Sequence, residues 1–176
     1  MLQVSQRGQA REQLRESLCL EEDTWVVISA GSYTESDGIL DFLEAARILP
    51  DVIFLWYGET AAWRVKRKIK KAMKEATENV CFMGGVDREE FRAACLGTDI
   101  FLGLTWEGAE ESAVQEAFAC GATAVVRDIP VYRFRLKGGG NVHKVKNVED
   151  VVWACVRERM AAKEGENKIK EKQRLG

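Results

Sequence analysis

The chain has 176 residues, of which 46% are hydrophobic and 31% are charged, and its 26 basic residues nearly balance its 28 acidic ones. This length predicts a single domain that buries enough apolar surface to fold without disulfide bonds or a structural metal. The formal net charge of −2 argues against a general nucleic-acid-binding protein, which would carry a strong positive excess. The sequence has neither an apolar run long enough to span a membrane nor a signal-peptide pattern, so we expect a cytoplasmic protein.

The pattern of cysteines and histidine predicts no metal site and no disulfide framework. The five cysteines are widely spaced, and no two of them form a Cys-x-x-Cys pair. The only histidine, His143, has no cysteine near it in the sequence, which disfavours a zinc site. An odd number of scattered thiols suits a reducing compartment. We therefore expect no metal and no cofactor.

Short apolar runs alternate with longer amphipathic stretches along the chain. The apolar runs are typical of strands buried on both faces, and they lie at 25–31, 52–58, 79–83, 99–104, 123–126 and 142–145. The amphipathic stretches predict helices at 39–49, 63–76, 87–95, 112–120 and 149–161, with Asp87 as the N-cap of the third. We expect one domain over 21–162, flanked by a linker or first helix at 1–20 and a polar helical or disordered tail at 163–176.

Repeated strand–helix alternation predicts an α/β fold with a doubly wound parallel sheet of about six strands. Sheets of this kind bind ligands beyond the carboxyl ends of their strands, where the strand order reverses. The loops that follow the predicted strands are therefore the candidate ligand-binding segments. They are 31–38, 58–62, 83–87, 104–112 and 127–133.

The first of these loops, Gly31-Ser-Tyr-Thr-Glu-Ser-Asp-Gly38, has the small residues of a phosphate-binding turn that leads into a helix. It has neither the Gly-Lys-Ser/Thr of a P-loop nor the pattern Gly-x-Gly-x-x-Gly. Asp37 suits the positive end of the helix dipole but would repel an anionic ligand. A simple strand–helix connection is the alternative.

Four carboxylates, those of Glu107, Glu110, Glu111 and Glu116, lie in and just after the loop that follows the fourth predicted strand. Such a cluster can accept hydrogen bonds from sugar hydroxyls. An acid/base pair of a glycoside hydrolase is the other interpretation, which an open parallel sheet of this size disfavours.

A dense basic segment occupies residues 64–74 and holds seven arginines and lysines. A solvated helix face is one interpretation, and attraction to anionic lipid headgroups is the other, at ~1 kcal/mol for each basic residue near such a surface. Nucleic acid is disfavoured, because no aromatic stacking platform accompanies the charges.

Several motifs occur in a characteristic order, among them Phe54-Leu-Trp-Tyr-Gly58, Glu116-Ala-Phe-Ala-Cys-Gly121 and Arg127-Asp-Ile-Pro-Val-Tyr132. With these motifs, residues 10–160 resemble the C-terminal, donor-nucleotide-binding domain of family-4 retaining glycosyltransferases with the GT-B fold. The nearest subgroup is the diacylglycerol glucosyltransferase-like enzymes. The resemblance implies a UDP-hexose as donor substrate, with no metal.

The resemblance also implies roles for particular residues. Glu116 matches the second acidic residue of the Glu-x7-Glu motif, which contacts the donor ribose. The turn at 84–86 would flank the nucleobase, and the loops at 31–38 and 107–112 would face the diphosphate and hexose. The catalytic candidates are Glu107 and Glu110, and the donor-binding candidates are Gly31, Ser32, Ser36, Asp37, Gly58, Gly84, Gly85, Val86, Gly108, Glu111, Ser112 and Glu116.

The sequence departs from the family pattern in two motifs. The basic pair of the first loop falls on Ser36 and Asp37, and the first acidic residue of the motif falls on Gly108, beside Glu107. The family's N-terminal acceptor domain also has no counterpart in the chain. We expect a nucleotide-sugar-binding domain that is inactive alone and transfers a hexose to a hydroxyl acceptor, such as a lipid, together with an acceptor domain from elsewhere. A peripheral membrane contact through 64–74 would accompany this role. The alternative is a degenerate, engineered or excised domain with a scaffold role.

Overall fold

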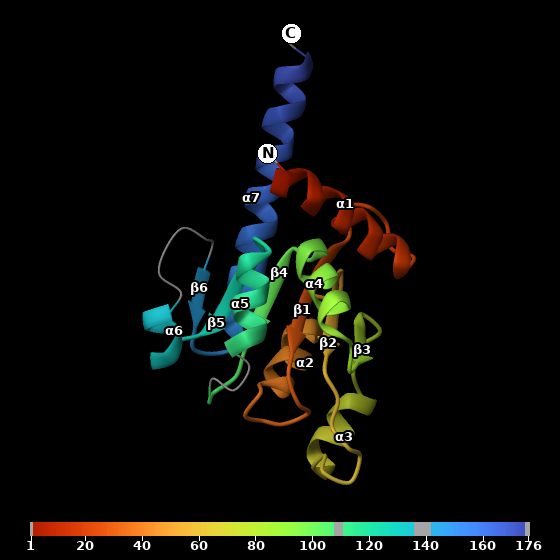
Figure 1. The fold of residues 1–176 in the computed structure, drawn as a ribbon, viewed down its shortest axis with the longest axis vertical. Coiled ribbons are helices and arrows are strands. Elements are labelled where there is room, and N and C mark those ends of the chain that lie inside the picture. The colour runs from red at the N-terminus through yellow and green to blue at the C-terminus, as the bar shows by residue number, and fades with distance from the viewer. Residues whose placement is uncertain (1, 108–110, 136–141, 175–176) are drawn as a thin grey trace.

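The computed structural model describes residues 2–107, 111–135 and 142–174. Its centre is a six-stranded parallel sheet with the strand order β3-β2-β1-β4-β5-β6 (Figure 1). The expected doubly wound parallel sheet is therefore confirmed, and the strand order reverses between β1 and β4. The strands are β1 (Trp25–Ala30), β2 (Val52–Tyr57), β3 (Val80–Gly84), β4 (Ile100–Gly103), β5 (Thr123–Arg127) and β6 (Val142–Val145).

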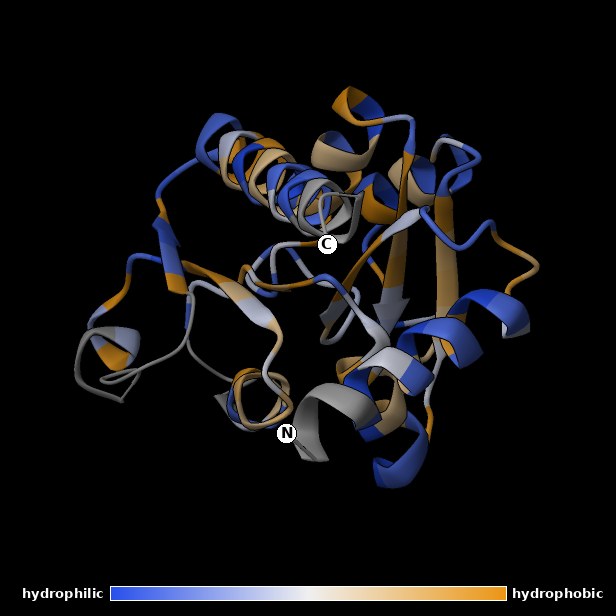
Figure 2. Cartoon of the chain, turned by 90° about the horizontal axis from the view of Figure 1, so that it is seen from above, coloured by the Kyte–Doolittle hydropathy of each residue, from blue (hydrophilic) through white to orange (hydrophobic). Residues whose placement is uncertain are grey.

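Helices connect the strands and cover both faces of the sheet (Figure 2). The helices are α1 (Leu2–Ser17), α2 (Ile39–Ile48), α3 (Arg67–Lys74), α4 (Arg88–Gly97), α5 (Glu111–Ala119), α6 (Pro130–Arg135) and α7 (Val148–Arg174). The C-terminal part of α7 extends beyond the sheet, as Figure 1 shows.

Two hydrophobic clusters form the core, one on each face of the sheet. Alternate residues of β1 serve opposite clusters, because successive side chains of a strand point to opposite faces. Val27 thus belongs to the cluster that includes residues of α2, α3 and α7, whereas Val26 and Ile28 belong to the cluster that includes residues of α1, α4, α5 and α6. All three side chains are fully buried. Burial on both faces explains why this strand appears in the sequence as a continuous apolar run.

The helix expected at 63–76 is shorter than predicted and begins at Arg67. The backbone of Lys66 is extended, and the amide of Arg64 donates instead to the carbonyl of Ala61 in a turn. Cations oppose the dipole at the N-terminus of a helix, so the basic residues Arg64 and Lys66 disfavour an earlier start. The apolar spacing alone therefore overestimated the length of this helix.

The N-terminal helix α1 packs on α4 through a buried arginine. Arg15 is 1% exposed and donates to the Asp99 carboxylate at 2.6 Å and to the carbonyls of Thr24 and Gly97. Asp99 also accepts from the amide of Val26 at the start of β1. The ion pair between Arg15 and Asp99 therefore fixes the position of α1 relative to the start of β1.

Candidate functional site

A cavity of about 990 Å³ lies at the carboxyl ends of β1, β2 and β3 and is bounded by α4 and α5. This is the edge at which open parallel sheets bind ligands. The residues that line it are Ala30, Gly31, Ser32, Tyr57, Gly58, Glu59, Gly85, Val86, Asp87, Arg88, Phe91, Arg92, Ser112, Ala113, Gln115, Glu116 and Ala119.

The floor of the cavity is formed by close approach of the loops after β1 and β2. Gly58 has a φ of +120°, and a Cβ built on it would lie 2.3 Å from the carbonyl oxygen of Gly31. Glycine is therefore required at this position for both its conformation and its size. The amide of Gly58 donates to the carbonyl of Gly84 at 2.8 Å, which ties in the loop after β3. The three loops thus form one connected floor.

The first loop is closed by its own side chains. The Asp37 carboxylate accepts from the amide of Ser32 and from the hydroxyl of Thr34, both at 3.0 Å. The amide of Tyr33 donates to the hydroxyl of Thr60 at 2.7 Å. Asp37 is only 8% exposed and does not line the cavity, and neither does Ser36. The carboxylate of Asp37 therefore organises the loop from within.

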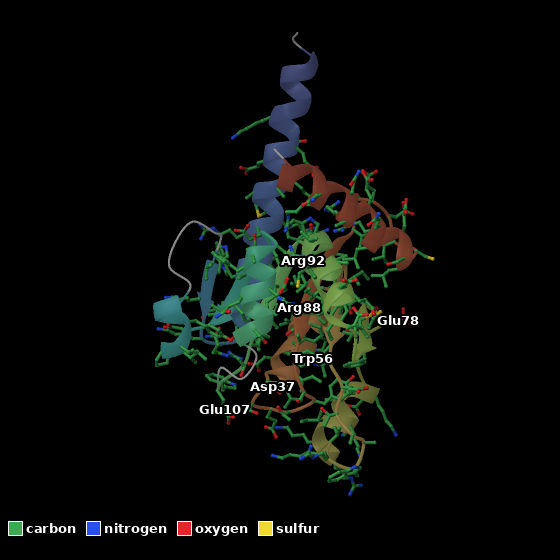
Figure 3. The ribbon with its side chains drawn as sticks, viewed as in Figure 1. Asp37, Trp56, Glu78, Arg88, Arg92 and Glu107 are labelled. Carbon is green, nitrogen blue, oxygen red and sulfur yellow. The ribbon has the colours of Figure 1, made fainter. Side chains whose placement is uncertain are left out.

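The wall opposite this floor carries a carboxylate held between two arginines. Glu116, on α5, accepts from Arg92 at 2.9 Å and from Arg88 at 3.2 Å. The side chain of Glu116 is 14% exposed. Figure 3 shows both arginines on α4, with Asp37 and Glu107 lower in the view. The ion pairs link α4 to α5 across the side of the cavity.

The loop after β4 is supported from below by Arg127, which is 1% exposed. Its guanidinium forms an ion pair with Asp41 and donates to the carbonyl of Leu104 at 3.4 Å. It also lies 3.9 Å from the centre of the Trp106 ring, a cation–π contact. The amide of Trp106 in turn donates to the carbonyl of Ser36 at 2.7 Å. The loops after β1 and β4 are thereby joined.

The structure brings together part of the set of residues predicted from the sequence. Seven of the donor-binding candidates line the cavity, and Gly84 supports the floor. Ser36, Asp37 and Glu107 do not line it, and Glu107 is exposed. Gly108 and Glu110 lie outside the described residues, as does the side chain of Glu111. The seven are Gly31, Ser32, Gly58, Gly85, Val86, Ser112 and Glu116.

Sequence reasoning missed the contribution of α4, which supplies Arg88, Phe91 and Arg92 to the cavity. The signal was present in the sequence, because Asp87 predicted the start of this helix. The Asp87 carboxylate does cap it, accepting from the amide of Glu90 at 2.9 Å. Residues 88 and 92 are then one turn apart on the same face.

One further residue of the cavity, Tyr57, has a shifted pKa. Burial raises the pKa of Tyr57, at the cavity wall, to about 12, with a smaller contribution from the carboxylate of Glu90. Among residues 2–107, 111–135 and 142–174, no three His, Cys, Asp or Glu side chains are grouped as a metal site. No helix in the described part of the chain is long and apolar enough to cross a bilayer.

Comparison with known sequences identifies the family and two relatives of this chain. A family model described as glycosyl transferases group 1 matches residues 10–174. The processive diacylglycerol alpha-glucosyltransferase of Acholeplasma laidlawii is 34% identical over 145 residues, which are 78% of this chain and 44% of that enzyme. The alpha-galactosylglucosyldiacylglycerol synthase of Streptococcus pneumoniae is 29% identical over 128 residues, covering 71% and 34% of the two chains. The chain thus spans less than half the length of these relatives.

Several solved structures share the fold of this chain. Anabaena Alr3699/HepE in complex with UDP-glucose matches with a TM-score of 0.69 at 14% identity, over 86% of this chain and 44% of that one. The catalytic domain of cholesterol-alpha-glucosyltransferase from Helicobacter pylori matches with a TM-score of 0.61 at 18% identity, over 85% and 91% of the chains. At these identities the likeness concerns the fold, and it agrees with a C-terminal domain of the GT-B type.

Proposed function

Because this chain belongs to the group 1 glycosyl transferases, we propose that its cavity binds a nucleotide sugar, with a UDP-hexose as the donor. The observation that carries this proposal is Glu116, a partly buried carboxylate on the wall of a glycine-floored cavity at the carboxyl edge of the sheet. Two solved structures with this fold are described as complexes with UDP or UDP-glucose.

In the proposed complex the nucleoside lies between α4 and α5. A carboxylate can accept hydrogen bonds from both hydroxyls of a ribose, and such charge-assisted bonds are stronger than neutral ones. Glu116 is therefore the ribose-binding residue of the proposal. The turn at Gly85 and Val86 faces the same cavity and leaves room for the base. The hexose would extend toward Ser112 and the segment that precedes α5.

The charges that line the cavity lead us to expect weak binding of UDP. Three carboxylates, those of Glu59, Asp87 and Glu116, line it against the two guanidinium groups of Arg88 and Arg92. The cationic pair of the family's first loop is replaced by Ser36 and Asp37. We expect a Kd for UDP no tighter than about 0.1 mM, which corresponds to roughly −5.5 kcal/mol.

Calorimetric titration of UDP and 2′,3′-dideoxy-UDP tests the proposal directly. Wild-type protein should prefer UDP by at least about tenfold, because each hydrogen bond to a charged group contributes roughly 1.5–3 kcal/mol. Glu116→Gln should abolish most of this preference. The matched control is Glu90→Gln, which removes an exposed carboxylate of α4 that does not line the cavity. An equal affinity of wild type for both nucleotides would contradict the assignment of Glu116.

For the reaction, we propose transfer of the hexosyl group to a hydroxyl acceptor of lipid type, with the anomeric configuration retained. Support comes from the names of the relatives, which act on diacylglycerol or glycosylated diacylglycerol. Transfer also requires that an acceptor be held against the donor. We propose that a domain beyond the residues of this chain, or on another chain, holds it, so these residues alone should not turn over UDP-glucose. A domain that has lost catalysis and serves as a scaffold is the alternative, which Asp37 and Gly108 favour.

A peripheral contact with an anionic membrane surface is a further part of the proposal. Seven basic residues between Arg64 and Lys74 are exposed around α3. Trp63, just before them, is 82% exposed, with the guanidinium of Arg64 5.3 Å from its ring centre. Exposed tryptophan beside lysine and arginine suits the boundary between headgroups and water. Such a contact would keep the donor site of a cytoplasmic domain close to a lipid acceptor in the membrane.

A further inference from the structure

A cavity that binds a nucleoside diphosphate must supply positive charge or free amide donors to its phosphates. Among the described residues that line the cavity, Arg88 and Arg92 are the two cations. Both come from α4, on the side opposite the loop to which the family pattern assigns this charge.

The first loop has few donors left for an anion. The amide of Gly31 donates to the carbonyl of Tyr57 at 2.9 Å. The amide of Ser32 donates to Asp37, and that of Tyr33 donates to Thr60. Three successive N–H groups at the end of β1 are thus engaged within the protein. A phosphate at this loop would have to displace the buried carboxylate of Asp37, which repels it.

The two arginines, by contrast, are held by contacts that they can exchange. The side chains of Arg88 and Arg92 are 85% and 57% exposed, and within the part of the chain that the structure describes each forms one ion pair, with Glu116. Only the guanidinium side of each pair is exposed, so an arginine can leave Glu116 for a stronger partner once another donor satisfies that carboxylate. The planar fork of donors in arginine matches the oxygens of a phosphate.

We propose that Arg88 and Arg92 form the phosphate-binding charge of this site and thus replace the basic pair that is missing from the first loop. The inference rests on the proposed function, since it concerns the same ligand. When ribose hydroxyls occupy Glu116, its carboxylate is shared with the ligand, and the guanidinium groups turn to the adjoining phosphates. The ion pairs of the unliganded protein hold both arginines at the cavity until then.

The experiment compares uridine with UDP, because only UDP carries the phosphates. Binding of each is measured by protein amide shifts for wild type, for Arg88→Gln and for the double variant Arg88→Gln/Arg92→Gln. We expect the double variant to lose at least tenfold in affinity for UDP, with the affinity for uridine changed by less than about twofold. Arg88→Gln alone should give a smaller loss of the same kind, and its high exposure keeps the fold intact.

The control variant is Arg157→Gln/Lys163→Gln, which removes two exposed charges from α7, away from the cavity. It should leave both affinities unchanged. Equal losses for uridine and UDP in the arginine variants would show that the arginines only position Glu116, and would overturn the inference. Unchanged UDP affinity in the double variant would overturn it as well. If wild type binds neither uridine nor UDP, the proposed function itself is wrong and the inference falls with it.

Discussion

Asp37 holds the first loop in its conformation, and we expect this role to contribute measurably to the free energy of unfolding. Its carboxylate satisfies the amide of Ser32 and the hydroxyl of Thr34 while being 8% exposed. Asp37→Ala leaves these donors without their partner. We expect a loss of about 1–3 kcal/mol in the free energy of unfolding, measured with urea.

Glu35→Ala is the matched control for Asp37→Ala, because Glu35 lies in the same loop with an exposed ion pair to Lys68 at 3.4 Å. Removing an exposed pair should cost under about 1 kcal/mol. Equal losses for the two variants would show that the carboxylate of Asp37 does not organise the loop.

Tyr57 gives a second prediction for a single residue, in the alkaline range. Burial raises the pKa of its hydroxyl from 10.0 to about 12. Below pH 10 the hydroxyl is protonated in both states, but between about pH 10 and 12 the unfolded chain loses this proton while the folded chain keeps it. The free energy of unfolding should therefore fall across this window, by up to about 2–3 kcal/mol from this group.

Urea unfolding of wild type and Tyr57→Phe between pH 9 and 12 checks this dependence. Phenylalanine has no proton to lose, so the variant should show a shallower fall, while other titrating groups act equally on both proteins. Parallel curves for the two proteins would contradict the assigned shift.

At the scale of elements, α3 allows a test of the proposed membrane contact. Lys70 and Lys74 are exposed on this helix. Among the described residues the ion pairs of α3 are those of Lys68 and Lys71, not of these two lysines. Each lysine near an anionic surface contributes ~1 kcal/mol, or roughly fivefold in binding. Lys70→Gln/Lys74→Gln should weaken binding to phosphatidylglycerol vesicles, measured by co-sedimentation, by up to about twenty-five-fold, and added salt should weaken it further.

Arg157→Gln/Lys163→Gln provides the charge-matched control for the vesicle experiment, since it removes the same charge from α7. It should sediment with the vesicles as wild type does. Equal sedimentation of wild type with phosphatidylcholine and phosphatidylglycerol vesicles would rule out the contact through α3.

Elements differ in how far their sequence predicts them. β1 could be predicted because burial on both faces leaves a continuous apolar run. The length of α3 could not, since the same apolar spacing fits a longer helix and the basic residues at its N-terminus disfavour an earlier start. The position of α1 depends on Arg15 and Asp99, which lie 84 positions apart in the chain. Only the folded sheet brings that pair together.

At the scale of the whole molecule, the position of the candidate cavity followed from the topology of the sheet. Loops at the carboxyl ends of parallel strands had to meet, and Gly31, Gly58 and Gly85 do line one cavity. The direction in which a side chain points within a loop could not be predicted from the topology. Asp37 turns into its loop because two donors there are unsatisfied without it, whereas Arg88 and Arg92 reach the cavity because α4 packs beside α5.

The central claim is that this cavity binds UDP, and amide shifts measured during a UDP titration test it most directly. The account predicts shifts that saturate at millimolar UDP and map to the floor at 31–32 and 57–59, the turn at 85–88 and the start of α5 at 112–116. Residues of α3, between Arg67 and Lys74, should stay unperturbed. Shifts confined to that basic helix, or none at all at millimolar UDP, would contradict the account.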